Sequence, residues 1–130
     1  MEKTLFYKEL GRLLYAIAAA DGRVQKKERD TLKWVVKDLL VPVESGLDHH
    51  GTDKAYITEF EFDVLADRHA TSQEAFDSFV AYMAGHHKDL TEEQRELVLT
   101  CAEAVAHAYH GVGAKELPLL IELNKHLRQG

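Results

Sequence analysis

Apolar residues recur every three or four positions along most of this chain, and this helical spacing constrains its fold more than any other feature. The first stripe consists of Phe6, Leu10, Leu13, Leu14 and Ile17. Further segments show the same spacing, and only two prolines interrupt the chain. We therefore predict an all-α chain that folds as a compact bundle of about six helices with short connections.

Each further stripe predicts one helix with one buried face. In chain order the stripes are Leu32, Val35, Val36 and Leu39; Tyr56, Ile57, Phe60, Val64 and Leu65; Phe76, Phe79, Val80 and Met83; Leu97, Val98, Cys101, Val105 and Ala108; and Leu117, Leu120, Ile121, Leu123 and Leu127. We expect these faces to form the core of the bundle.

Residues that start or stop helices separate these segments. Gly22 ends the first helix and Pro42 follows the second. Residues 41–52 lack periodicity and are predicted to form a loop, so that the third helix begins near Thr52. Capping boxes, in which a threonine precedes a glutamate or glutamine by three residues, open the next two helices. These pairs are Thr71 with Glu74 and Thr91 with Gln94.

The composition disfavours several classes of function. The net charge of −6 disfavours nucleic acid and anionic membranes as partners, because both attract basic surfaces, and it favours cations or a basic protein surface. The single cysteine rules out an internal disulfide framework, and no apolar run approaches the roughly 20 residues that span a bilayer. The first segment mixes charged with apolar residues, unlike a signal peptide. We therefore expect a cytoplasmic protein without membrane insertion.

Two stretches of the chain follow the same pattern. Residues 13–39 and 101–127 each run from an alanine-rich helix through a polar residue, a glycine and a short loop to a glutamate and a leucine-rich helix. We predict a single domain over 1–130 with an internal helix–loop–helix pseudo-repeat, whose halves lie around 5–40 and 92–128. The corresponding residues are Asp21 and His110, Gly22 and Gly111, and Glu28 and Glu116. The glycine of the second copy, with Gly113, is predicted to stop the fifth helix.

The first copy carries the pattern A-A-D-G-x-V-x-x-x-E, formed by Ala19, Ala20, Asp21, Gly22, Val24 and Glu28. This pattern resembles the hallmark of TerB-like domains, the family linked to tellurite resistance. The resemblance implies a bacterial, cytoplasmic, all-helical domain with a degenerate second copy, a role in stress or metal-oxyanion resistance, and metal binding through the acidic residues of the motif. Some relatives are fused to other domains, including co-chaperones, as interaction modules. The second copy departs from the motif, because His110 stands where the first has Asp21.

The two carboxylates of the motif form the candidate site. Asp21 continues the inward stripe of the first helix to its end, where the helix dipole disfavours a carboxylate and a donor or cation must compensate. Glu28 begins the second helix, where the dipole favours it. In a divalent-metal site, Asp21 and Glu28 would supply oxygen ligands and His110 a nitrogen, with Glu116 beside it, a set that suits Zn, Mn, Fe or Ca. The alternative is that both carboxylates cap the loop and bind no metal.

The other metal-ligating residue types carry weaker hypotheses. Glu103, His107 and His110 lie four and three residues apart and share one face of the predicted fifth helix. That face lies opposite Cys101, so we expect it to see solvent. Cys101 itself lies on the apolar stripe, which predicts a buried small hydrophobe and not a nucleophile.

A non-catalytic role is predicted, because the chain contains no Gly-rich phosphate loop and no H-E-x-x-H, C-x-x-C or G-x-S-x-G motif. The alternative to metal binding is a protein–protein interaction module, of the co-chaperone-like scaffold kind or a homodimer, that uses Trp34 or the 41–52 loop as its contact surface. The second helix also presents a basic outer face, which we interpret as solvated. Its residues are Lys26, Lys27, Arg29, Lys33 and Lys37.

Overall fold

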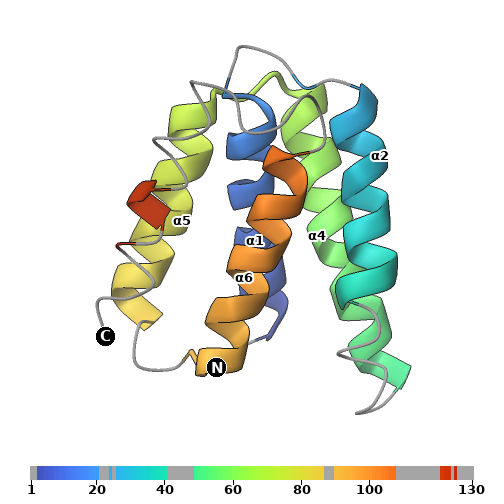
Figure 1. Cartoon of the computed structure of the whole chain (residues 1–130), viewed down its shortest axis with the longest axis vertical. Coiled ribbons are helices and arrows are strands. Elements are labelled where there is room, and N and C mark those ends of the chain that lie inside the picture. The colour runs from blue at the N-terminus through green and yellow to red at the C-terminus, as the bar shows by residue number, and fades with distance from the viewer. Residues whose placement is uncertain are drawn as a thin grey trace.

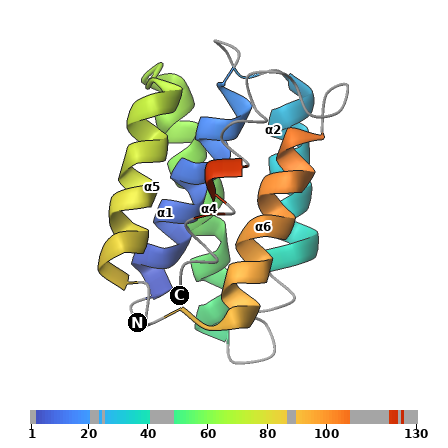
Figure 2. The ribbon, with the colours of Figure 1, turned by 60° about the vertical axis from the view of Figure 1, so that its left-hand side comes forward.

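A central helix organises the bundle. α1 (Lys3–Ala18) packs against α4 (His49–Asp67), α5 (Ser72–His86) and α6 (Glu92–Ala106), and Figures 1 and 2 show it enclosed by these helices. α2 (Lys26–Trp34) continues directly into a π-helix, η1 (Val35–Leu40), along one edge of the bundle. The computed structural model describes residues 3–20, 24, 26–40, 49–86, 90–107, 121–123 and 125. Within these ranges all regular structure is helical, so the predicted all-α bundle is confirmed.

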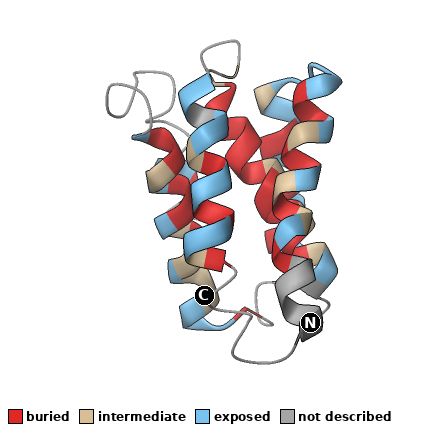
Figure 3. Cartoon of the chain, turned by 90° about the vertical axis from the view of Figure 1, so that its right-hand side faces the viewer, coloured by how far each residue is buried: buried red, intermediate tan, exposed pale blue. Residues whose placement is uncertain are grey.

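The apolar stripe of α1 is buried as predicted. Its five residues are at most 2 % exposed, because neighbouring helices cover this helix on several sides. The enclosure also buries residues outside the stripe, among them Tyr15, whose ring meets that of Phe62 edge to face at 5.6 Å. Figure 3 shows the buried residues on the sides of the helices that face one another and the exposed residues on the outer sides.

The π-helix changes which residues of the second helical stretch face the core. Val35, Val36 and Leu40 are buried, whereas Leu39 is only partly so. A π-helix pairs residues five apart, so Leu40 takes the place under Val35 that a regular α-helix would give to Leu39. The prediction of Leu32, Val35 and Val36 as core residues is confirmed.

α4 differs at its start from the prediction. It begins at His49, so the part of the predicted 41–52 loop from residue 49 onward is helical, and residues 41–48 lie outside the described residues. The helix ends in a Schellman motif, in which the amide of Ala70 donates to the carbonyl of Leu65 and that of His69 to Ala66. His69 adopts a φ of 54° there, the left-handed conformation that such a cap requires.

Two side-chain hydrogen bonds connect the turn between α4 and α5 to α1. The hydroxyl of Tyr15 donates to the carbonyl of Ala70 at 2.7 Å, and that of Ser72 donates to the carbonyl of Ala16 at 2.6 Å. Burial, assisted by the negative charge of Glu74, raises the pKa of Tyr15, so its hydroxyl remains a donor at neutral pH. These bonds fix the C-terminal end of α4 against α1.

The helix starts predicted at Thr71 and Thr91 are confirmed, but the predicted capping box is complete only at Thr91 and half formed at Thr71. The side chain of Thr91 accepts from the amide of Gln94, and the Gln94 side chain accepts from the amide of Thr91, which completes a capping box. Thr71 accepts from the amide of Glu74, whose carboxylate pairs with Arg68. α6 ends at Ala106, before the stop predicted at Gly111.

Candidate functional site

The outer face of α4 carries the most unusual surface in the described part of the chain. Tyr56, Phe60 and Val64 are 44 %, 69 % and 39 % exposed, and their spacing of four residues places them in one row along the helix. The prediction that these three residues belong to the core is wrong. We call them the apolar row. Large apolar side chains grouped in this way mark interaction surfaces more often than isolated ones do.

The opposite face of α4 is the one that packs on α1. It consists of Ala55, Thr58, Glu61, Phe62, Leu65 and Ala66, all of which are buried. α4 therefore offers two apolar faces, and its sequence alone does not tell which of them is buried. The buried face includes a threonine and a glutamate, which hid it from a search for apolar periodicity.

A close approach of two backbones selects this face. A Cβ atom added at Gly11 would lie 2.6 Å from the carbonyl oxygen of Thr58 and 3.1 Å from the Cβ of Glu61. The hydroxyl of Thr58 donates to the carbonyl of Tyr7 at 2.9 Å across the same contact. Because glycine has no side chain, α1 admits α4 at a distance that another residue would prevent. The contact holds Thr58 and Glu61 inward, and the apolar row consequently faces solvent.

Four polar side chains form a cluster where α1, α4 and α5 meet: Glu9, Arg12, Glu61 and Ser78. Arg12 Nε donates to Glu61 Oε2 at 2.8 Å, and a terminal nitrogen of Arg12 donates to Glu9 Oε1 at 2.8 Å and to Ser78 Oγ at 2.7 Å. Ser78 Oγ lies 3.0 Å from both oxygens of Glu9, to which it donates. Glu9 and Glu61 are 4 % and 8 % exposed. We call these four residues the buried polar cluster.

The four side chains of the buried polar cluster bind one another. Burial lowers the pKa of Arg12, but its hydrogen bonds and charge interactions with Glu61 and Glu9 outweigh that effect and raise the pKa above its ordinary value. The guanidinium thus stays charged and occupies the space between the two carboxylates that a metal cation would need. The hydrogen bonds of the cluster connect Glu9 and Arg12 of α1 to Glu61 of α4 and Ser78 of α5, so the cluster links all three helices.

A second row on α4 borders the apolar row. Glu59, Asp63 and Asp67 are each one turn apart, and Glu59 and Asp63 directly precede Phe60 and Val64 of the apolar row along the chain. None of the three is buried, and within the described residues none forms an ion pair. We call them the acidic row. The outer face of α4 is therefore half apolar and half anionic.

The residues predicted to bind metal are not tested by the structure. Asp21, His110 and Glu116 lie outside the described residues, as does the side chain of Glu28, whose backbone belongs to the first turn of α2. Among the residues that are described, no three of the types His, Cys, Asp and Glu are grouped closely enough to hold a metal ion.

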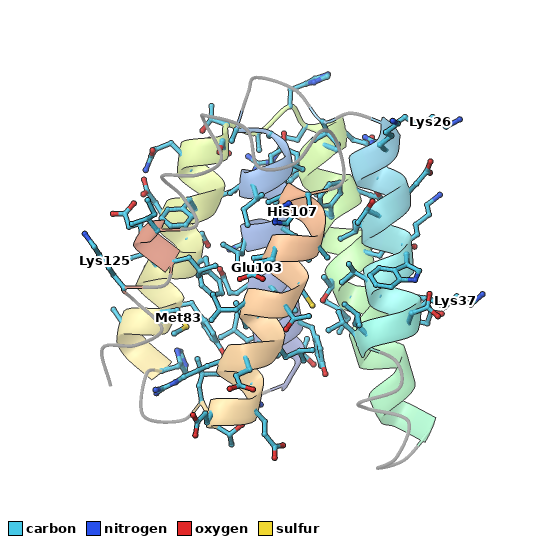
Figure 4. All side chains as sticks on the ribbon, in the orientation of Figure 1. Lys26, Lys37, Met83, Glu103, His107 and Lys125 are labelled. Carbon is cyan, nitrogen blue, oxygen red and sulfur yellow. The ribbon has the colours of Figure 1, made fainter. Side chains whose placement is uncertain are left out.

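Two predictions about α6 are confirmed. Glu103 on this helix and His107, the residue that caps its C-terminal end, are exposed (Figure 4), while His110, the third member of the predicted face, lies outside the described residues. Cys101 is buried, and burial raises the pKa of its thiol to about 12. A thiol that is protonated and inaccessible at neutral pH is no nucleophile.

α2 and the start of η1 present the predicted basic face. Lys26, Lys27, Arg29, Lys33 and Lys37 are exposed, and Figure 4 shows Lys26 and Lys37 pointing away from the bundle. Trp34 is 49 % exposed, half packed and half in solvent. Within the described residues none of these basic side chains forms an ion pair, which agrees with the interpretation of a solvated face.

Comparison of the chain with protein-family models, with curated proteins and with solved structures finds no match. The TerB-like resemblance of the Asp21–Glu28 loop accordingly remains a hypothesis. Within the described residues, no helix combines the length and the apolar character needed to cross a membrane.

Proposed function

We propose that this chain is a non-catalytic helical domain that binds a protein partner through the outer face of α4. The observation that carries the proposal is the exposure of Phe60, a large apolar residue at the middle of a helix whose other face is fully packed. Complete burial of such a side chain contributes about 1.5–3 kcal/mol of favourable free energy, and most of this is not gained in the isolated domain because the ring is in solvent. A partner that covered Tyr56, Phe60 and Val64 would recover it.

The arrangement around this face supports a docking role over catalysis. The titratable groups of the buried polar cluster bind one another, and the Cys101 thiol is closed off in the core. The bonds of the buried polar cluster join α4 to α1 and α5, and a surface that is held in place before binding loses less entropy when the partner arrives. The proposal follows the interaction-module alternative of the sequence, with the surface moved from Trp34 and the 41–52 loop to the apolar row.

A metal site at Asp21, Glu28, His110 and Glu116 is the second proposal, together with the cytoplasmic stress or tellurite-resistance role that the TerB-like resemblance implies. Its support is the motif itself; α2 starts at Lys26, so the backbone of Glu28 lies in a first helical turn, where a carboxylate was expected from the sequence. Elemental analysis of the untagged protein tests it. Near-stoichiometric metal that is lost in Asp21→Asn would support the site, whereas metal-free protein with a melting temperature indifferent to divalent ions would reject it.

Site-specific photo-crosslinking tests the docking proposal. A photoreactive phenylalanine analogue at position 60 is expected to cross-link one saturable partner in a lysate of the source cells, and the same analogue at exposed Thr100 on α6 is the control. The wild-type domain should compete for that partner, and Phe60→Ser should not. Equal cross-linking from positions 60 and 100 would reject the outer face of α4 as the docking surface.

A further inference from the structure

We infer that the partner which docks on α4 is a basic amphipathic helix. This inference rests on the proposed docking function and adds the chemistry of the partner. The apolar row and the acidic row run side by side along the same helix, over about two turns each. A ligand that fits both must place apolar side chains beside lysines or arginines at helical spacing. An amphipathic helix with a basic flank has this pattern.

The acidic row points to a cationic partner independently of the apolar row. Glu59, Asp63 and Asp67 lie at i, i+4 and i+8, and like charges at this spacing repel each other and disfavour the helix. Within the described residues no cation is paired with them. Among the described residues this face thus carries two unfavourable features, exposed apolar surface and three carboxylates without an ion-pair partner, and a single basic helix would relieve both.

The charge of this face also selects among the occupants. A second copy that used the same face would bring three further carboxylates into the interface, and like charges facing one another cost affinity. Nucleic acid and anionic lipid surfaces are themselves negative and would be repelled. Cationic side chains are the complement that the outer face of α4 lacks.

Binding of synthetic peptides tests the inference. The probe is a fluorescein-labelled helical peptide of about 18 residues with leucines on one face and lysines on the rest, long enough to form a helix on a surface. The first control replaces every lysine with glutamate, and the second keeps the composition but scrambles the order. Fluorescence anisotropy of each peptide with the full chain gives Kd as a function of salt. Only the ordered leucine–lysine peptide should bind, and more weakly as salt increases.

Three protein variants locate the binding. Glu59→Gln/Asp63→Asn/Asp67→Asn removes the acidic row, and Phe60→Ser interrupts the apolar row. The matched control removes three exposed carboxylates from α6 with Glu93→Gln, Glu96→Gln and Glu103→Gln in one chain. We expect each of the first two variants to weaken binding by about tenfold, and the α6 variant to change it by less than about twofold.

The outcomes separate the inference from the proposed function. If the leucine–glutamate peptide binds as tightly as the leucine–lysine peptide and Phe60→Ser weakens both, docking on α4 stands and the basic partner is overturned. If the triple substitution on α6 weakens binding as much as the triple substitution of the acidic row, the peptide responds only to the net charge of the chain, and the inference fails. If no peptide depends on Phe60, both the inference and the docking function fail. Sedimentation of the unliganded chain is expected to show a monomer, and a dimer lost on Phe60→Ser would replace the basic helix with a second copy.

Discussion

The approach of α4 to Gly11 gives the sharpest test of what orients the outer face of α4. In Gly11→Ala the new Cβ would lie 2.6 Å from the carbonyl oxygen of Thr58, a backbone atom that cannot rotate away. The two helices must separate by several tenths of an ångström. That movement stretches the bond from Thr58 to the Tyr7 carbonyl and the bond from Arg12 to Glu61, now 2.9 Å and 2.8 Å.

The expected cost follows from opposing terms. Forcing an extra carbon into a packed contact costs about 1–3 kcal/mol, and weakening the two hydrogen bonds adds about 1 kcal/mol. Alanine gains about 1 kcal/mol over glycine in helix propensity. We therefore expect Gly11→Ala to lose about 1–3 kcal/mol of unfolding free energy. Gly85→Ala is the control, because a Cβ at Gly85 in α5 meets nothing within 4 Å and should stabilise the chain by about 0.5–1 kcal/mol.

Urea unfolding followed by far-ultraviolet circular dichroism measures both variants under the same conditions. The resulting difference between the two variants, about 1.5–4 kcal/mol, corresponds to roughly 5–15 °C in melting temperature for a domain of this size. Gly11→Ala that is as stable as Gly85→Ala would show that α1 and α4 do not meet at this distance, and the account of why the apolar row faces solvent would then be wrong.

Four further results are expected. Arg12→Met should lose about 3 kcal/mol of unfolding free energy in urea, because it leaves two buried carboxylates without their cation. Adding Glu61→Gln to this variant should restore part of the loss. An unchanged unfolding free energy in Arg12→Met would show that the cluster is not buried. His69→Gly should gain up to about 1 kcal/mol and His69→Val should lose about 1–2 kcal/mol, because φ is 54° there; equal unfolding energies would contradict the left-handed cap. Burial raises the pKa of the Cys101 thiol from 9.0 to about 12, so the buried thiol contributes fully to the unfolding free energy below pH 9 and less as the pH rises. Between about pH 8 and about pH 10 the wild type should therefore lose about 1 kcal/mol of unfolding free energy relative to Cys101→Ala, measured by thermal melts of both proteins. The same pH dependence in both proteins would refute this. Asp21→Asn should lower metal content, measured by elemental analysis, if the loop holds a metal, and leave it unchanged if Asp21 caps the loop.

The parts of the fold that depend on local sequence could be predicted from it. The stripe of α1 is buried on a helix enclosed by others, and the start of α6 follows from the short-range bonds of Thr91 and Gln94. Such features need no information from distant residues. The end of α4 is also local, but its left-handed residue is His69 where a glycine is usual, and that concealed the cap.

The orientation of α4 could not be predicted, because distant residues decide it. Phe60 and Phe62 are equally apolar and both fit a helical stripe, yet one is 69 % exposed and the other fully buried. The deciding contacts join Thr58 to Tyr7, 51 positions away, and Glu61 to Arg12, 49 positions away. A search for apolar periodicity discounts a face that contains a glutamate, although an arginine from another helix can neutralise it. The same reasoning assigned Tyr56, Phe60 and Val64 to the core, and so it did not indicate the docking surface that we propose.

The π-helix shows a second limit of the same kind. A constant helical period places Leu39 on the buried face, and the sequence contains no residue that announces the change to five-residue pairing. The burial of Leu40 beside Val35 follows from packing of η1 against α4 and α6, which lie later in the chain. Tertiary contacts set the phase of this helix in the same way that they set the face of α4.

The most direct test of the central claim compares two phenylalanines that lie two residues apart. Phe60→Ala is expected to leave the unfolding free energy within about 0.5 kcal/mol of the wild type, because the ring is in solvent, whereas Phe62→Ala should lose about 3–5 kcal/mol by opening a cavity in the core. Urea unfolding of the two variants beside the wild type gives both numbers in one experiment. A large loss in Phe60→Ala with little in Phe62→Ala would mean that α4 packs through its other face, and that Tyr56, Phe60 and Val64 belong to the core and form no docking surface.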